Sequence, residues 1–169
     1  AVGLPASYHI NWFLSHLPDD GSVQVKSLGL DLGGLTIAGP KAREVLQKCS
    51  KTDVSHDAMR FMAVREMDVG MTPATVGRVS YSGDLGYEIW VKPASLARLY
   101  DDLMAAGTDF DIRPFGARAL NALRLEKNYG SWGREYRPLY GPVEVGLDRF
   151  VAYDKPADFI GKAAALAER

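Results

Sequence analysis

The chain has 169 residues, enough for one domain with a sizeable core or for two small lobes. Hydrophobic residues make up 47% of it, aromatic residues 10% and charged residues 24%, which is typical of globular proteins and excludes disordered or fibrous classes. The formal net charge is -1, so no broad positive field would draw the chain onto nucleic acid or an anionic membrane.

The sequence carries no sign of a membrane anchor or of export. No apolar run approaches the roughly 20 residues that span a bilayer, and the first residues lack the basic stretch and apolar core of a signal peptide. The single cysteine, Cys49, excludes an intramolecular disulfide and fits a reducing compartment. We therefore expect a cytoplasmic protein, or one of the mitochondrial matrix if the source is eukaryotic. Both ends of the chain lack the features of natural termini, so we expect a fragment of a longer protein.

The first part of the chain predicts a helix, two strands and another helix. Apolar residues at helical spacing predict a helix over 8–17, and alternating apolar and polar residues predict a strand over 23–28. A more buried strand is predicted over 35–38. Pro40 follows that strand and starts a helix that runs to Cys49, because proline fits the first helical turn, where no amide partner is needed.

The next elements are predicted as three strands and two helices, over 60–68, 74–81, 87–91, 93–106 and 114–129. A flexible turn around Gly83 joins the second and third of these strands into a hairpin. In the last helix, Leu120, Leu123 and Tyr129 can share one face. Arg124 is expected to stay in solvent.

Together these elements predict an α+β fold. Helices are expected to cover one face of an antiparallel sheet, as in a ferredoxin-like, split βαβ lobe. Beyond the last predicted helix, residues 130–146 are rich in loop-forming types. The chain has no internal repeat, heptad array or low-complexity tract.

Sequence patterns of the common catalytic and cofactor sites are missing. The chain has no GxSxG, HExxH, paired CxxC or P-loop motif, and its glycines form no GxGxxG between a strand and a helix. His9, His16 and His56 lack the spacing to each other and to carboxylates that a tetrahedral metal site requires. We therefore predict no metal site and no nucleotide-cofactor motif within these residues.

The most informative segment is the predicted hairpin over 78–90, where Tyr81 ends one strand and Glu88 lies on the next. A phenol and a carboxylate seven positions apart across a tight turn can face the same pocket. The amide and amine edge of a pterin ring presents adjacent N–H donors that match a carboxylate, and its aromatic face stacks on a phenol. The residues alone leave a second interpretation open, an ordinary hairpin with an exposed glutamate.

Four motifs resemble, in the same order, motifs of the glycine-cleavage T-protein family. The hairpin sequence SYSGDLGYEI at 80–89 is similar to the family's GYTGExGxEI. The turn IAGP at 37–40 is similar to L-x-G-P, the sequence ALRLE at 122–126 to S-L-R-L-E, and GPVEVGL at 141–147 to T-P-x-E-A-G-L. This resemblance implies the family's tetrahydrofolate-binding fold.

Two further runs resemble dimethylglycine and sarcosine dehydrogenases in particular. LEKNYGSW at 125–132 is similar to E-K-x-Y-x-x-W, and DFIGK at 158–162 to D-F-I-G-[KR]. In such enzymes a preceding FAD domain oxidises an N-methyl group, and tetrahydrofolate traps the product as 5,10-methylenetetrahydrofolate. The resemblance implies that residues 1–34 end a first folate-binding lobe, 35–129 form a central α+β lobe, and 130–169 lead into a further lobe.

Carried over residue by residue, the resemblance assigns the pterin-binding glutamate to Glu88 and two aromatic residues of the folate pocket to Tyr81 and Tyr129. The T-protein arginine that pairs with this glutamate falls on Leu120 here. Arg118 lies two residues away, about 200° around a helix, and can bind folate in its place only if the helix shifts.

Other parts of the family pattern concern residues outside this pocket. Arg124 matches the arginine inside the S-L-R-L-E motif, for which the resemblance implies an internal ion pair. The polar and aromatic segment 132–137 can border the folate tail, contact the flavin domain or pack between domains. The family's general base is expected upstream of Ala1.

These observations predict a tetrahydrofolate-binding fragment of an FAD-dependent N-methyl amino acid dehydrogenase, with the flavin domain of the same parent chain as its partner. A stand-alone aminomethyltransferase of the glycine-cleavage type is a second hypothesis. A third is a non-catalytic module with the same fold, which the leucine at position 120 keeps open. Because the general base and the flavin are expected outside these residues, we expect no turnover by the chain alone.

Overall fold

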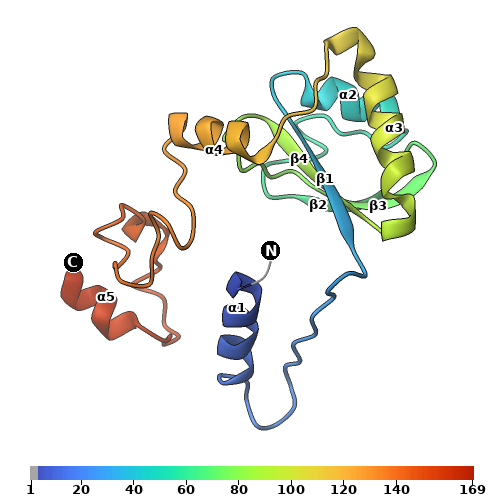
Figure 1. Ribbon diagram of the computed structural model, residues 1–169. Coiled ribbons are helices and arrows are strands. Elements are labelled where there is room, and N and C mark those ends of the chain that lie inside the picture. The colour runs from blue at the N-terminus through green and yellow to red at the C-terminus, as the bar shows by residue number, and fades with distance from the viewer. Residues whose placement is uncertain (1–3) are drawn as a thin grey trace. The chain divides into compact units, whose positions relative to one another are not determined.

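The computed structural model describes residues 4–169 (Figure 1), and they fall into two compact units that meet between Tyr129 and Gly130 in the sequence. The strands are β1 (Gly33–Ala38), β2 (Val64–Val69), β3 (Thr72–Gly77) and β4 (Gly86–Val91). The helices of the first unit are α1 (Leu4–Leu14), α2 (Ala42–Cys49), α3 (Leu96–Gly107) and α4 (Ala117–Glu126), with 3-10 turns η1 (Pro93–Ser95) and η2 (Thr108–Phe110). The second unit contains η3 (Asp148–Phe150) and α5 (Lys162–Glu168). The division of the chain into lobe segments 1–34, 35–129 and 130–169, which the resemblance implies, stays a prediction.

The strands form one antiparallel sheet in the order β1-β4-β3-β2. In this order β4 is a central strand, and β1 and β2 are the edges of the sheet. The register places Glu88 on β4 directly across from Thr36 on β1 and from Gly77 on β3. The predicted α+β class and the antiparallel sheet are confirmed.

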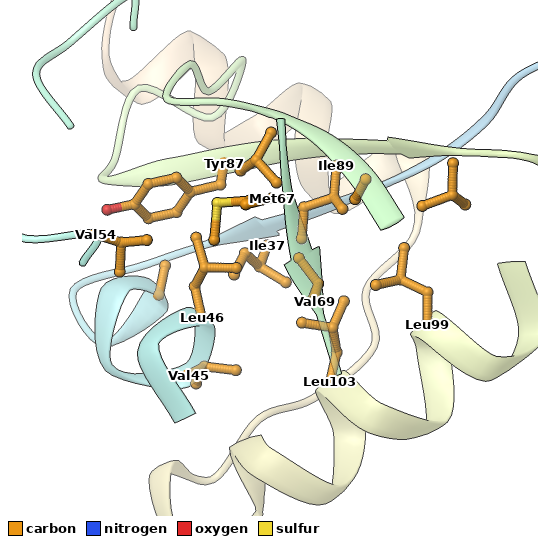
Figure 2. Packing of buried hydrophobic residues seen from close by; sticks show 14 of the residues in the cluster. Ile37, Val45, Leu46, Val54, Met67, Val69, Tyr87, Ile89, Leu99 and Leu103 are labelled. Carbon is orange, nitrogen blue, oxygen red and sulfur yellow. The ribbon is translucent and has the colours of Figure 1, made fainter. Parts of the chain in front are cut away.

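Helices α2 and α3 pack on one face of the sheet, and their apolar side chains meet those of the strands there (Figure 2). Tyr87 and Ile89 enter this core from β4, and Leu46 and Leu99 enter it from the two helices. Each of these side chains is fully buried, which contributes roughly 1.5–3 kcal/mol per aliphatic or aromatic side chain. Because strand residues alternate between faces, Glu88 points away from this core.

Helix α2 follows directly from its sequence pattern. Ala42, Val45 and Leu46 stand three and four residues apart and form its buried stripe. Glu44 lies in the first turn and Lys48 in the last, where each charge interacts favourably with the helix dipole. The helix predicted after Pro40 is therefore confirmed in type, with its first helical residue slightly later in the chain. No helix within residues 4–169 has the length and apolar character needed to cross a bilayer.

The strands predicted over 23–28 and 60–68 differ from the observed ones. Residues 22–28 form no helix and pair with no strand within the described part of the chain, so the strand predicted over 23–28 is wrong. Alternating apolar residues favour a strand only where a neighbouring strand supplies partners for the backbone groups. Strand β2 begins at Val64 and not at residue 60, because the backbone turns at Met62, which has a φ of 67°.

A corner between α2, α3 and the β2–β3 turn surrounds the single thiol. The Gly70 N–H donates to the Cys49 carbonyl at 2.6 Å, and the Cys49 thiol lies 3.6 Å from the Asp102 carbonyl. Asp102 Oδ1 accepts a hydrogen bond from Arg98 Nε at 2.9 Å, while Oδ2 is buried without a partner in the described residues. Burial raises the pKa of the Cys49 thiol, and the negative charge of Asp102 raises this pKa further.

This environment predicts slow alkylation of Cys49, because the thiolate is the reactive form and a raised pKa reduces its population near pH 8. Replacing Asp102→Asn removes a negative charge and should speed the reaction with iodoacetamide. The matched control is Asp101→Asn, at an exposed neighbouring position on α3. Equal alkylation rates for Asp102→Asn and the unchanged chain at several pH values would contradict this account.

Two methionines provide a direct test of the core. Met59 is 0% exposed and Met71 is 82% exposed. Met59→Ala should lower the free energy of unfolding by about 2–5 kcal/mol, because it leaves a cavity in a packed interior. Met71→Ala should change it by no more than about 0.5 kcal/mol. Urea denaturation followed by circular dichroism measures both values, and similar losses for the two variants would disprove the assignment of the core.

Candidate functional site

The outer face of the sheet consists of strand residues that point away from α2 and α3. Its central positions are Gly34, Thr36, Thr75, Gly77, Glu88 and Trp90, related to one another by the strand registers. Glu88 lies near the middle of this face, on the central strand β4. Its neighbour across β3 is Gly77, which has no side chain, and its neighbour across β1 is the small Thr36. On the β3 side the indole of Trp90 reaches over Gly77, and on the β1 side the small Thr36 leaves space beside the Glu88 carboxylate.

The charge of Glu88 has no protein partner within residues 4–169. The side chain is half-buried, yet no hydrogen bond or ion pair in this part of the chain involves its carboxylate. Its oxygens are not among the buried atoms that lack a partner, which are Asp102 Oδ2 and Tyr153 Oη. Glu66 on the same face differs, because it accepts a hydrogen bond from Thr75 Oγ1 at 2.6 Å. Glu88 is thus an accessible acceptor for hydrogen-bond donors of a ligand.

Trp90 is a second outer-face residue, which the sequence analysis did not select. It lies two positions after Glu88 on β4, so both side chains stand on the same face. The indole is half-buried and sits against Gly34 and Gly77, the glycines of the two neighbouring strands. Residues two apart on a strand lie on the same face, so its spacing from Glu88 could have identified Trp90 from the sequence.

Tyr81 lies in the loop between β3 and β4 and not on a strand. Strand β3 ends at Gly77, so the strand predicted to reach Tyr81 is too long. Gly83 has a φ of 82°, and the hydroxyl oxygens of Ser80 and Ser82 are 2.7 Å apart, so this segment folds into a loop of its own. Tyr81 and Glu88 are consequently not opposite each other across a tight turn.

Arg124 is the buried centre of a cluster that joins this loop to α4. The side chain is 1% exposed. Its Nε donates to Asn121 Oδ1 at 3.2 Å and one of its terminal nitrogens donates to the Tyr129 carbonyl at 2.9 Å. Its guanidinium carbon lies 5.9 Å from the centroid of the Tyr81 ring, within range of a cation–π interaction. Arg124 thus links Tyr81 to the backbone of Tyr129.

The predicted solvent exposure of Arg124 is wrong, because its donors are satisfied inside the protein by groups that lie close only after folding. The implied internal ion pair stays a prediction. The expectation that Tyr129 shares a helix face with Leu120 and Leu123 is also wrong. Helix α4 ends at Glu126, the chain reverses direction near Asn128, which has a φ of 57°, and the Tyr129 side chain is 43% exposed.

Two further contacts hold α4 against the loop. Lys127 Nζ lies 3.2 Å from Asp84 Oδ1 in an ion pair. The Lys127 side chain also passes over Gly83, where an added Cβ would come within 2.6 Å of the Lys127 Cβ. The loop that carries Tyr81 is therefore positioned by α4.

Arg118 and Leu120 occupy different environments on α4. Arg118 is exposed and makes no hydrogen bond or ion pair within residues 4–169. Leu120 is half-buried and lines a cavity. No interaction in the described chain joins Arg118 to Glu88, so the helix shift needed for Arg118 to substitute is not observed.

A cavity of about 600 Å³ runs along the free edge of β1. Its walls come from β1, the start of α2, the middle of α3 and residues 110–117 with Leu120. Glu88, Tyr81 and Tyr129 do not line it, but Gly34 and Thr36 do, and these are the β1 residues paired with Trp90 and Glu88. The cavity therefore reaches the β1 residues that pair with Glu88 and Trp90.

The second unit contains the segment 132–137 that the sequence analysis selected. Trp132 and Tyr136 form a β-bridge there, and the Ser131 N–H donates to Glu135 Oε2 at 2.9 Å. The Tyr136 hydroxyl accepts a hydrogen bond from the Gly130 N–H at 3.2 Å. These contacts define a compact local turn, and its role toward a ligand or another domain stays a prediction.

The sequence matches the GCVT N-terminal domain family over residues 3–155. The chain belongs to this family. The resemblance to the glycine-cleavage T-protein family is thereby confirmed.

Curated relatives of this GCVT N-terminal domain include two classes of enzyme. Mitochondrial dimethylglycine dehydrogenase of Homo sapiens is 44% identical over 142 residues, which cover 84% of this chain and 16% of that protein. The aminomethyltransferase of Alkaliphilus metalliredigens is 31% identical over 147 residues, which cover 87% of this chain and 40% of that protein. The chain thus spans less than half the length of either relative.

Among solved structures, the domain resembles the heterotetrameric sarcosine oxidase of Corynebacterium sp. U-96, determined in complex with pyrrole 2-carboxylate. The likeness covers 58% of this chain and 49% of that chain, with a TM-score of 0.49 and 17% sequence identity.

Two arginines of α4 provide a matched test of the Arg124 cluster. Arg124→Ala should lower the free energy of unfolding by about 1–3 kcal/mol or more, because it leaves buried acceptors without donors. Arg118→Ala, on the exposed side of the same helix, should change it by less than about 0.5 kcal/mol. Chemical denaturation of both variants measures the difference. Equal stability of the two variants would show that the cluster does not hold α4 in place.

Proposed function

We propose that the chain is the tetrahydrofolate-binding part of an FAD-dependent N-methyl amino acid dehydrogenase of the dimethylglycine or sarcosine type. The observation that carries the proposal is the Glu88 carboxylate, half-buried on the outer face of the sheet and without a partner within residues 4–169. Membership of the family supports folate as the ligand, and the greater identity to dimethylglycine dehydrogenase supports this class of enzyme.

The chemistry of a pterin ring fits Glu88. The ring presents an amide N–H and an exocyclic amino group side by side, and two adjacent donors match the two oxygens of a carboxylate. A hydrogen bond to a charged group contributes roughly 1.5–3 kcal/mol when both groups leave water. The small Thr36 on β1 leaves space for the edge of the ring beside Glu88.

The cavity along β1 offers room for the rest of tetrahydrofolate. It has a volume of about 600 Å³, and its lining includes Thr36, the β1 residue paired with Glu88. Leu103, Phe115 and Leu120 give it apolar walls suited to an aromatic ring of the tail. Tyr81 and Tyr129, joined by Arg124, are proposed to border the folate on the side of the β3–β4 loop.

In the complete enzyme, FAD in a separate domain would oxidise the N-methyl group of the substrate. The residues described here would bind the folate and orient its ring to receive the one-carbon unit, which makes their contribution one of proximity. We expect the family's general base outside the chain, so the chain alone should have no turnover. We assign the parent enzyme to the cytoplasm, or to the mitochondrial matrix in a eukaryote.

Glu88→Gln tests the proposal. The variant keeps the size of the side chain but loses its charge and one acceptor, so the affinity of the complete parent polypeptide for tetrahydrofolate should fall by about 10- to 100-fold. Anaerobic isothermal titration calorimetry measures this affinity.

Glu66→Gln is the control, because Glu66 lies on the same face of the sheet but at its exposed edge. It should leave the affinity for tetrahydrofolate unchanged. Equal affinity of Glu88→Gln and the unchanged parent would remove Glu88 from the binding site, and the absence of any folate binding by the parent would disprove the proposed function.

The identity to aminomethyltransferases supports a second candidate, a folate-dependent aminomethyltransferase of the glycine-cleavage type. The sequence that precedes Ala1 in the parent gene distinguishes the two candidates. A flavin-binding domain with a GxGxxG motif upstream would select the dehydrogenase, and its absence would select the aminomethyltransferase. A parent that binds no folate would instead match the non-catalytic module.

A further inference from the structure

Trp90 holds a large aromatic ring on the face of the sheet opposite the hydrophobic core. The core between the sheet, α2 and α3 contains its β4 neighbours Ile89 and Val91, and Trp90 points the other way. The indole is only half-buried, so it gains less free energy from burial than a side chain in the core does. The position of Trp90 is therefore not explained by packing of the core.

The indole lies against the backbone of both neighbouring strands. A Cβ added to Gly34 on β1 would come 3.1 Å from Trp90 Cδ1, and a Cβ added to Gly77 on β3 would come 3.0 Å from Cη2 and Cζ3. The two ends of the ring thus rest over glycines on opposite sides of β4. A ring supported at both ends lies along the sheet and presents its other aromatic face outward.

The same contacts bring the ring next to the carboxylate of the site. Gly77 is the cross-strand partner of Glu88, so the end of the indole over Gly77 reaches the position across from Glu88. A flat heterocycle on the outward aromatic face would then lie with its edge toward the carboxylate. The aromatic surface and the hydrogen-bond acceptor are adjacent on one strand.

We infer that Trp90 is the surface on which the pterin ring stacks while the polar edge of the ring binds Glu88. The inference rests on the proposed function and adds a binding residue to it. Tyr81 is less suited to this position, because its ring already contacts the guanidinium of Arg124 and lies in the β3–β4 loop. Offset stacking on an indole suits a tetrahydropterin, because its pyrimidinone ring is planar and conjugated and has polarised edges.

The experiment compares Trp90→Ile and Trp90→Phe in the complete parent polypeptide. Isoleucine keeps strand propensity and apolar character but removes the aromatic face. We expect Trp90→Ile to weaken tetrahydrofolate by about 10- to 100-fold, because aromatic stacking of a heterocyclic base has this magnitude. Trp90→Phe should restore affinity to within about threefold, since a phenyl ring still stacks. Trp12→Ile, which changes a tryptophan outside the sheet, should have no effect.

A second ligand separates a ring contact from a general loss of structure. Tetrahydropterin, which lacks the aminobenzoyl-glutamate tail, should lose the same factor in Trp90→Ile as tetrahydrofolate does. If Trp90→Ile binds both ligands as tightly as the unchanged parent while Glu88→Gln does not, the inference about Trp90 fails and the proposed function stands. If the unchanged parent binds neither ligand, both fail.

A spectroscopic measurement keeps the test decisive even if Trp90→Ile does not fold. The parent is labelled with 5-fluorotryptophan, and the fluorine resonance of Trp90 is assigned from its absence in Trp90→Phe. Saturation with tetrahydropterin should shift this resonance, because a stacked ring changes the local field, and should leave the Trp12 resonance in place. An unchanged Trp90 resonance at saturation would overturn the inference.

Discussion

The register of β4 is the constraint on which the rest of the structure depends. As a central strand it is paired on both sides, so its residues alternate strictly between the two faces of the sheet. Tyr87 and Ile89 fill the core against α2 and α3, and this fixes Glu88 on the opposite face. A shift of one residue would bury the carboxylate and expose the core side chains, which is energetically prohibitive. The apolar core therefore determines where the polar site can be.

Residues with little or no side chain leave space on the outer face of the sheet for the indole of Trp90 and for a ligand. Gly34 and Gly77 accept the indole of Trp90 against the backbone, and Thr36 occupies little space on the other side of Glu88. Away from the sheet, the buried guanidinium of Arg124 ties α4 to the loop that carries Tyr81. Glu88 and the Arg124 cluster remain separate within residues 4–169, so the folate itself is proposed to connect them.

Local patterns in the sequence predicted much of the fold. The strands around Ile37 and Ile89 and the helices α2 and α3 follow from apolar periodicity and from proline and glycine positions, and these features act over a few residues. The placement of Glu88 on a strand next to Tyr87 also followed, because aromatic and β-branched residues favour a strand over 87–91.

Features that depend on distant partners could not be predicted in this way. The apolar alternation over 23–28 has no neighbouring strand in the described chain, and nothing local signals that absence. Arg124 was expected in solvent because charged side chains usually are, whereas one of its acceptors, the Tyr129 carbonyl, becomes available only when the chain reverses after α4. Tyr81 leaves the sheet because the loop before β4 is longer than the tight turn that its glycines indicated.

The central claim is that the Glu88 carboxylate binds the polar edge of a folate ring. The most direct measurement is a crystal structure of the complete parent polypeptide with tetrahydrofolate bound. The account predicts both oxygens of Glu88 within about 2.7–3.1 Å of the ring amide N–H and the exocyclic amino group. A structure in which a protein side chain occupies the Glu88 carboxylate, and the folate ring lies elsewhere, would contradict it.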